Sequence, residues 1–542
     1  MPAEGSLETE ARAGGGADAP PSAAEAAAVR RRVLVGAGYA AAFALFFVLC
    51  YLTARTAATS SDGANNALQG FDLLHGNPLL SDWIIGDATY YTFELPVYAI
   101  TTAVFGLGPT AGDVEPAVVY LIIAILAAAL AKGRKTGMQG AVRVGAVLAV
   151  LCIPLYAQSI DGGAEGAALL LAEPNHLGTS VFLLAAFLLL DRGAHWRATP
   201  ALLLLILTAG QLGDATVRFV GVVTVLVVSL MRIARERKFK TPDGWFVIAA
   251  IASVAVSEGV RAIMRAVGAY SMVPPVTHLA SPLDWPSHLW YSARVISKMY
   301  GIVTPLSNRL MSGICISLST AVLLAMIYAL VRTAVRWWQV ERADQLLAVA
   351  ALALFGAYAL YAMATITNTH EIAEFVPLSA ALAARAIPKG IALLRPTAIA
   401  IATAALVPLI AAAARPVSVS QYDPIIAWLE AHGQTYGIST YWLASSTTLH
   451  TGGRVSVRAV INDGGVLGAY PWETKISWYD PKQHVATFVI ADVDDPVGNA
   501  SPADVEHIYG VPTLTAIFGD HMVMVYSANL LEKVLQPVPA SG

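Results

Sequence analysis

The sequence is dominated by long apolar runs that alternate with short polar segments. A membrane-spanning helix needs roughly 20 apolar residues, or somewhat fewer where its ends are polar but still helical. The pattern therefore predicts an α-helical polytopic membrane protein with about eleven transmembrane helices. Their cores lie near residues 33–52, 115–131, 142–156, 177–190, 200–213, 216–231, 245–260, 312–331, 345–364, 374–384 and 396–414. The runs at 177–190, 200–213 and 374–384 are short, so buried or re-entrant helices are alternatives there.

Lysine and arginine residues are concentrated in every second polar segment. Arg30, Arg31 and Arg32 precede the first apolar run, which has no clear small-residue cleavage site and is therefore predicted to be an uncleaved signal-anchor. Residues 1–29 are rich in Ala, Gly, Pro and Glu and would form a disordered cytoplasmic tail. With this tail inside, the inner segments contain most of the basic residues between Lys132 and Arg395. The positive-inside rule then predicts that the C-terminus lies outside.

This orientation requires that Pro96 to Leu107 does not cross the membrane, so we predict an amphipathic helix there, on the outer surface. The outer face then comprises loops 53–114, 157–176 and 261–311 of a transmembrane domain that spans residues 30–414. Residues 415–542 lack long apolar runs. They alternate strand-like stretches, such as ISTYWLA and HVATFVIAD, with helix-like stretches, such as DPIIAWLEAHG and ANLLEKVLQ. This alternation predicts a small extracytoplasmic α/β domain at the C-terminus.

Composition supports a multi-pass protein of the plasma membrane, in contact with membrane lipids, and excludes several functions. Of the 542 residues, 56% are hydrophobic and only 13% are charged, which exceeds the apolar content of soluble domains. The net charge of −3 argues against a nucleic-acid partner, which requires clustered basic residues. The sequence has no P-loop or GxGxxG motif, and its three cysteines fall inside apolar runs rather than in a disulfide or metal-binding pattern.

The polar stretch Ser60 to Pro96 contains the first candidate site residues. Asp62 could accept a proton from an acceptor hydroxyl, or one of Ser60, Ser61 and Asp62 could simply cap the following helix. Asp87 and Glu94 bracket the aromatic pair Tyr90 and Tyr91. Carboxylates beside aromatic rings are typical of carbohydrate sites, although solvated turns explain the same residues.

The second loop ends at Asn175 and His176, directly before an apolar run. His176 could carry a proton or donate to a phosphate at the membrane boundary, while Asn175 could equally serve as a helix cap. Asp214 and Arg218 are four residues apart at the next outer turn, a spacing that places them on one helical face. A mutual ion pair is the favoured interpretation, and phosphate binding by Arg218 is the alternative.

Two further groups complete the candidates. Arg294 shares a predicted interfacial helix face with Trp290 and Lys298, where it could bind a lipid phosphate or make ordinary contacts with anionic lipid. His370, Glu371 and Glu374 lie at the outer end of a late apolar run, where they could complete a site or favour the start of the helix. A divalent metal is compatible with these side chains, but no HExxH or comparable spacing indicates one.

This layout resembles the GT-C superfamily of polyprenyl-phosphate-sugar-dependent glycosyltransferases, which includes the protein O-mannosyltransferases and the aminoarabinose transferases. That group combines a multi-helix bundle with an acidic residue in the first outer loop, amphipathic helices on the membrane surface and often a soluble outer domain. The matching positions are Asp62 with the helix that follows it, the surface helix up to Leu107, and Glu374-Phe375-Val376-Pro377. The resemblance implies Asp62 as the catalytic base and a sugar site shaped by Asp87, Glu94 and His176.

The chain departs from this family at three motifs. Members commonly have an Asp-Glu pair where this chain has Asp62-Gly63, and a His-Pro-Pro motif before the surface helix where it has Glu94-Leu95-Pro96. They also have an Arg-Tyr pair near the late helix where this chain has Glu374-Phe375. Recognition of the donor phosphate would therefore fall to Arg218, Arg261 or Arg294. The whole chain also resembles a group of uncharacterised actinobacterial membrane proteins through DGANNALQGFDLLHGN, FELPVY, PNHLGTS and GDATVRFVG.

The leading hypothesis is the transfer of a hexosyl or pentosyl group from a polyprenyl-phosphate donor to a glycan or protein acceptor of the cell envelope, on the outer face. The main alternative is a non-catalytic envelope-assembly or binding protein. A transporter or flippase is disfavoured, because charged residues are nearly absent from the middle of the apolar runs and no pair of broken helices marks a midplane site.

Overall fold

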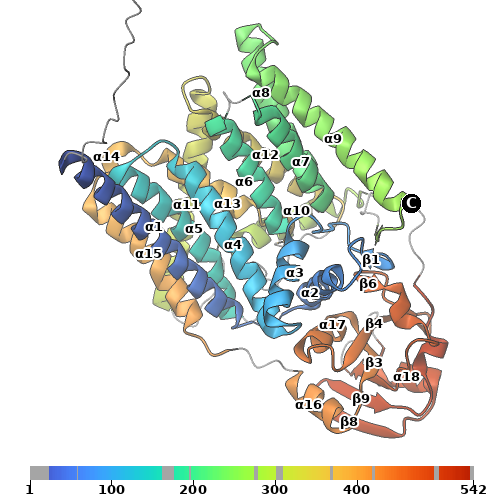
Figure 1. Cartoon of the computed structure of the whole chain (residues 1–542). Helices are drawn as coiled ribbons and strands as arrows, with labels where there is room; N and C mark the ends of the chain where they lie inside the picture. The colour runs from blue at the N-terminus through green and yellow to red at the C-terminus, as the bar shows by residue number, and fades with distance from the viewer. Residues whose placement is uncertain are drawn as a thin grey trace, which may run out of the picture. The chain divides into compact units, whose positions relative to one another are not determined.

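The computed structural model describes residues 23–57, 59–161, 176–193, 197–273, 279–300, 309–365, 370–417, 422–493 and 500–537. Residues 47–542 form one compact unit, to which all the packing below belongs, and the residues up to 46 form a separate unit. The chain is mostly helical, with strands confined to short loop segments and to its last part (Figure 1).

Each predicted apolar run coincides with a helix. These are α1 (Ala23–Ala54), α4 (Pro109–Lys132), α5 (Gly137–Asp161), α6 (Thr179–Gly193), α7 (Thr199–Gly213), α8 (Val223–Glu236), α9 (Pro242–Ala266), α11 (Arg309–Val335), α12 (Arg342–Ala362), α13 (Phe375–Ala386) and α15 (Arg395–Ala413). In the described part of the chain, 7 helices are long and apolar enough to cross a membrane. They confirm a multi-pass membrane protein, while the larger helix number and the orientation stay predictions.

Helix α13 lies at the centre of the bundle. All twelve of its residues are buried, and it contacts α4, α5, α11 and α12. The facing side of α4 is lined by buried alanines, among them Ala124, Ala127, Ala128 and Ala131. Small side chains let helices pack closely in a membrane, where the hydrophobic effect does not drive helix association. The short apolar run predicted at 374–384 is therefore a helix that is buried along its whole length.

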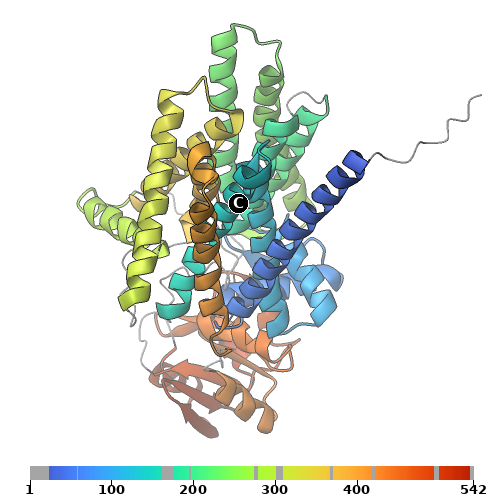
Figure 2. The same cartoon turned by 90° about the vertical axis from the view of Figure 1, so that its left-hand side faces the viewer.

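Three shorter helices lie beside the bundle: α2 (Ser61–Leu74), α3 (Glu94–Phe105) and α10 (Trp285–Met299). Helix α3 forms where the amphipathic helix was predicted, with Leu95 and Tyr98 buried and Ile100, Val104 and Phe105 exposed. In Figure 2 the yellow-green α10 lies across the direction of the long helices. The helical character of both segments is confirmed, and their position at a membrane surface stays a prediction.

The last part of the chain contains a six-stranded sheet with the order β5-β4-β3-β7-β9-β8. Its strands are β3 (Tyr436–Ser439), β4 (Ser456–Asp463), β5 (Val466–Ala469), β7 (Phe488–Asp492), β8 (Leu514–Phe518) and β9 (His521–Val525). Strand β3 pairs in parallel with β4 and β7, and the other pairs are antiparallel. Alternate residues of β7 enter two separate apolar clusters, one with α18 (Pro502–Tyr509) and one with α16 (Asp423–Ala431) and α17 (Tyr441–His450). Both faces of the sheet are thus covered.

Two local predictions in this region are wrong. Residues 441–444 were expected to continue a strand, but they begin α17, because their apolar side chains pack both on the sheet and on α2. Residues 528–536 were expected to be helical, but only a 3-10 turn forms, at Leu530–Lys533. The Asn529 side chain caps this turn at its start, and the Val534 backbone N–H donates to the Leu531 carbonyl at its end. In both cases tertiary contacts override the local pattern.

A second, three-stranded sheet joins segments that are far apart in sequence. Strand β1 (Trp83–Ile85) of the first loop pairs with β2 (Ser271–Met272) of the third loop and with β6 (Thr474–Lys475) of the last part. An ion pair of 2.7 Å between Asp72 and Lys475 and a hydrogen bond of 2.8 Å from the Ser477 backbone N–H to Asp82 reinforce this junction. The three segments therefore lie together at one end of the bundle, where Asp72 and Asp82 bond to residues of the last part of the chain.

Candidate functional site

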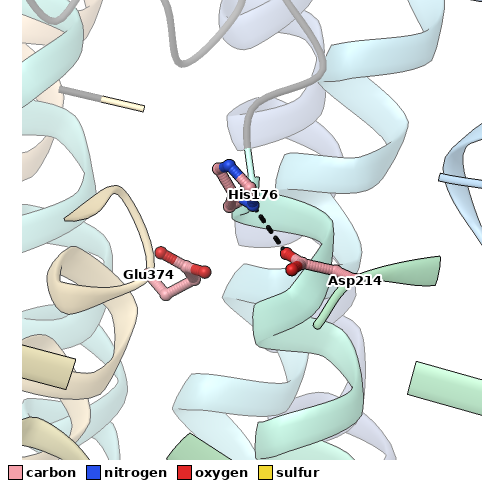
Figure 3. A group of neighbouring side chains, drawn as sticks. All are labelled: His176, Asp214 and Glu374. Atoms are coloured by element: carbon pink, nitrogen blue, oxygen red, sulfur yellow. Dashed lines mark hydrogen bonds and ion pairs between the residues drawn. The ribbon is translucent and has the colours of Figure 1, made fainter. Parts of the chain in front are cut away.

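Three polar side chains that adjoin different helices lie close together (Figure 3). His176 begins a 3-10 turn (His176–Gly178) that leads into α6, Asp214 follows α7, and Glu374 precedes α13. His176 Nδ1 lies 2.7 Å from Asp214 Oδ2. One ligand-type atom from each of the three side chains lies within 4.8 Å of the other two. We call these residues the His-Asp-Glu cluster.

Asp214 is held as an anion although it is buried. Its Oδ2 accepts hydrogen bonds from His176 and from the Thr179 hydroxyl, and its Oδ1 accepts one of 2.7 Å from the Thr216 backbone N–H. Burial opposes ionisation, but the positive charge of His176 and these donors outweigh it and lower the pKa of Asp214 to about 2. The first loop is anchored beside it, since the Thr89 backbone N–H donates to the Gly213 carbonyl at 2.8 Å.

Glu374 has no such support. Its side chain is fully buried, and neither carboxylate oxygen has a hydrogen-bond partner among the described residues. It is the N-cap residue of α13, but its side chain makes no capping hydrogen bond. Figure 3 shows its carboxylate turned toward His176 and Asp214. A buried carboxylate without donors requires a proton or a cation to neutralise it.

The His-Asp-Glu cluster fits a divalent cation by its chemistry, because imidazole and carboxylate groups are common ligands of Zn²⁺ and Mn²⁺. Such an ion would neutralise Glu374, as a proton would. The sequence did not indicate this cluster as a metal site, because its members come from three separate segments and no short spacing connects them.

Glu94 lies next to the cluster at the start of α3. Its carboxylate accepts a hydrogen bond from the Gly178 backbone N–H, and a Cβ atom at position 178 would overlap Glu94 Oε1. Burial, with a smaller contribution from the negative charge of Asp214, raises the pKa of Glu94 to about 8. The glycine at 178 therefore permits a protonated carboxyl group to sit against the first turn before α6.

Tyr90 connects these groups to the last part of the chain. Burial, together with the carboxylates of Asp214, Asp87, Glu473 and Glu94, raises the pKa of its phenol well above the usual value. Its ring centroid lies 6.3 Å from that of His176. Asp87 and Glu94 thus both lie close enough to Tyr90 for their charges to act on it, and their role in a sugar site stays a prediction. Tyr91 differs, because its hydroxyl donates to the Pro78 carbonyl at 2.5 Å and its ring packs on Tyr270.

Asp62 lies at the junction of α2 and α17. The cap of α2 is Ser60, whose hydroxyl accepts from the Gly63 backbone N–H at 3.2 Å, so the carboxylate of Asp62 is not used for capping. Instead, Asp62 Oδ1 accepts a hydrogen bond from the Tyr441 hydroxyl. Burial and the carboxylates of Glu473 and Asp62 raise the pKa of Tyr441, so its hydroxyl stays a donor at neutral pH. Glu473 is thus close to both Tyr441 and Tyr90.

The predicted ion pair between Asp214 and Arg218 is wrong. Asp214 has an extended backbone, and Arg218 begins a π-helix (Arg218–Val222), so the regular spacing of an α-helix does not apply. Asp214 pairs with His176, while Arg218 pairs with Glu258 on α9 and donates to Gln211 at 3.3 Å. Arg261 lies 3.4 Å from the same Glu258 carboxylate. Two guanidinium groups therefore share one carboxylate at the end of α9.

The remaining predicted residues lie apart from the cluster or are only partly described. Arg294 is exposed on α10 on the same side as the exposed Trp290, as expected for an interfacial face, and no hydrogen bond or ion pair among the described residues connects it to the cluster. Glu371 lies in a 3-10 turn (His370–Ile372) and not on one helical face with Glu374, because α13 begins only at Phe375. Asn175 and the side chain of His370 lie outside the described residues.

Sequence reasoning missed three members of the surrounding network. Glu115 of α4 is buried and hydrogen-bonds to the Tyr98 hydroxyl, while Glu473 and Tyr441 come from the last part of the chain. A signal existed only for Glu115, because a carboxylate close to a long apolar run is costly and often functional. Glu473 directly precedes strand β6 and Tyr441 begins α17. Nothing in the sequence indicated that either residue lies close to the first loop.

Comparisons with known proteins agree with this architecture. No family model matches the sequence, and no curated protein sequence matches it. The structure of ArnT from Cupriavidus metallidurans bound to undecaprenyl phosphate aligns with a TM-score of 0.54 and 10% identity, covering 90% of this chain and 98% of that chain. The apo structure of the same protein aligns with a TM-score of 0.55 and 10% identity, over 92% and 99%. The chain therefore shares the fold of these ArnT structures along nearly its whole length. The resemblance to actinobacterial proteins stays a prediction.

Proposed function

We propose that this chain is a membrane glycosyltransferase that moves a sugar from a polyprenyl-phosphate donor to an acceptor on the outer face of the plasma membrane. The observation that carries the proposal is the position of Asp62. Its carboxylate lies where the bundle meets the last part of the chain, oriented by the Tyr441 hydroxyl, at one end of a buried network of carboxylates and phenols. The shared fold with a protein whose structure holds undecaprenyl phosphate supports the donor class.

In the proposed reaction an acceptor hydroxyl attacks the anomeric carbon of the donor. The new bond joins the acceptor oxygen to this carbon, while the bond from the carbon to the phosphate oxygen breaks and its electron pair leaves with the polyprenyl phosphate. Asp62 accepts the proton of the hydroxyl as general base, an effect worth roughly 10²–10⁴ in rate. Because the attack is a direct displacement, the anomeric configuration inverts.

The other residues then have distinct roles. Glu94, with its raised pKa, can donate a hydrogen bond to a sugar oxygen, while Asp87 can accept one from a sugar hydroxyl. Arg218 and Arg261 share Glu258, so one positive charge remains to hold the donor phosphate. The His-Asp-Glu cluster keeps the charged pair of His176 and Asp214 next to the buried carboxyl group of Glu374.

The proposal is tested by incubating the purified chain in lipid with a panel of radiolabelled polyprenyl-phosphate sugars. Transfer should fall at least 100-fold in Asp62→Asn, on the order expected for the loss of a general base. Glu506→Gln, which neutralises an exposed carboxylate on α18, should leave transfer unchanged. Equal transfer by the parent chain and Asp62→Asn would rule out Asp62 as the base.

One observation favours the non-catalytic alternative. The hydrogen bond from Tyr441 could make Asp62 a docking residue that joins α17 to α2, beside the bond of 2.6 Å from the Ser445 hydroxyl to Asn65. A docking role predicts that Tyr441→Phe and Asp62→Asn expose the junction equally to limited proteolysis. The catalytic role predicts that both variants resist proteolysis like the parent chain, while Asp62→Asn alone loses nearly all transfer.

A further inference from the structure

A second polar feature lies at the opposite end of α13. Glu374 precedes this helix and Arg385 lies in its last turn, so the two are separated by about 16 Å along the helix axis. A cavity of about 250 Å³ opens beside Arg385. It is lined by Lys135, Gln139, Arg143, Tyr328, Arg332 and residues 385–389, which include Lys389. Five of these side chains are basic and none is acidic.

Two of the five basic side chains hold the bundle together. Arg143 donates to the carbonyl oxygens of Ala131 at 3.2 Å and of Arg385 at 2.8 Å. Arg385 pairs with Asp344 at 3.1 Å and with Glu341 at 2.6 Å. Cations at helix C-termini satisfy the last carbonyl groups and favour the helix dipole. These two arginines therefore have a structural role at the ends of α4 and α13.

The other cations have no such role. Lys135, Arg332 and Lys389 form no ion pair with any described residue. In addition, Arg143 Nε is buried without an acceptor, in a residue that is only 7% exposed. An unsatisfied donor on a buried charged group is costly unless something outside the protein accepts from it. The cavity thus gathers several donors and positive charges in an arrangement that an anion would stabilise.

The surroundings indicate that the anion belongs to a lipid. Helix α11 borders the cavity through Tyr328 and Arg332, and its neighbouring residues Val331 and Val335 are more than half exposed. An apolar helix surface beside a basic cavity fits acyl chains next to a headgroup, whereas a soluble anion would need no such surface. We propose that this cavity binds the phosphate headgroup of an anionic phospholipid, at the end of the bundle opposite the His-Asp-Glu cluster.

This proposal is independent of glycosyl transfer, because its ligand binds about 16 Å away from Glu374 along α13 and its readout is binding. The purified full chain in neutral detergent is titrated with short-chain phosphatidylglycerol, with short-chain phosphatidylcholine and with inorganic phosphate, and the increase in Tm is recorded. Phosphatidylglycerol should raise Tm in the parent chain, and the other two should not.

The matched variants carry three substitutions each. Lys135→Gln/Arg332→Gln/Lys389→Gln removes charge from the cavity, and Lys238→Gln/Lys240→Gln/Arg336→Gln removes the same charge from exposed positions outside it. Each basic group near an anionic lipid contributes about a fivefold factor, so the cavity variant should need about 100-fold more phosphatidylglycerol. The second variant should respond like the parent chain.

Several results would overturn the proposal. An equal loss of the phosphatidylglycerol response in both triple variants would indicate general attraction of the lipid to basic surface residues. A parent chain whose Tm rises equally with phosphatidylcholine would also overturn the proposal. A parent chain that responds as strongly to inorganic phosphate would assign the cavity to a soluble anion. Should the triple cavity variant fail to fold, Lys389→Gln on the exposed α14 (Lys389–Ala392) replaces it, with an expected loss of about fivefold. An unchanged response in that variant would also refute the proposal.

Discussion

The opposite environments of Asp214 and Glu374 give the sharpest prediction about the site. Both carboxylates are buried in one cluster, but Asp214 has three donors and Glu374 has none among the described residues. Neutralising each with its amide should therefore have different consequences. Asp214→Asn should destabilise the chain, whereas Glu374→Gln should not, because no donor loses its acceptor and burial already raises the pKa of the Glu374 carboxyl.

The magnitude follows from the pKa of Asp214. A pKa of about 2, against 3.8 for an unperturbed aspartate, corresponds to about 2 kcal/mol in favour of the charged form. The native pKa lies below the unfolded one, so this contribution is present above about pH 4 and is lost as the pH falls toward 2. Asp214→Asn should thus cost about 2 kcal/mol at pH 7 and progressively less below pH 4.

The assay is thermal unfolding of the purified chain in detergent, followed by tryptophan fluorescence at one fixed scan rate. For a chain of this length about 2 kcal/mol corresponds to a decrease of roughly 2 °C in Tm. Asp284→Asn, which changes an exposed carboxylate just before α10, is the control and should not alter Tm. The reasoning is refuted if Asp214→Asn unfolds like the parent chain, or if Glu374→Gln loses as much stability as Asp214→Asn.

Three further predictions concern the neighbouring groups. Burial raises the pKa of Glu94 to about 8. The parent chain should therefore lose about 5 kcal/mol of stability relative to Glu94→Gln as the pH rises from 4.5 to 8. Parallel profiles of unfolding free energy against pH for the two chains would contradict this. Gly178→Ala should lower stability by about 1–3 kcal/mol and reduce transfer, because its methyl group displaces the Glu94 carboxylate; Gly259→Ala on α9, with nothing within 4 Å, is the control in the same unfolding and transfer assays. Lys475→Gln should change the free energy of unfolding by less than about 1 kcal/mol, because its partly exposed pair with Asp72 is screened; a large decrease would show that this pair holds the junction.

Much of the fold follows from the sequence, because burial in lipid leaves a strong one-dimensional signal. Each apolar run became a helix, and the segment at Pro96 became the separate helix α3, while the orientation predicted from the basic residues stays a prediction. The last part was harder to predict. The stretch beginning at Tyr441 has strand-like composition but forms α17, because it packs between the sheet and α2. Such contacts involve residues far apart in sequence, which local patterns do not report.

The sequence indicated candidate site residues but not how they are arranged. The sequence placed Asp62, Glu94, His176 and Glu371 on one side of the bundle, and the structure brings Glu94 and His176 together. It could not show that Asp214 turns away from Arg218, because this depends on a π-helix that no composition signal marks. The pairing of Asp62 with Tyr441 was equally hidden, since it connects segments separated by the entire bundle.

The most direct test of the central claim is a transfer reaction in lipid with each labelled polyprenyl-phosphate sugar, in which the anomeric configuration of the product is determined by NMR. The account predicts a labelled product of inverted configuration from at least one donor with the parent chain, and none above background with Asp62→Asn. No product from any donor, or a product of retained configuration, would contradict it.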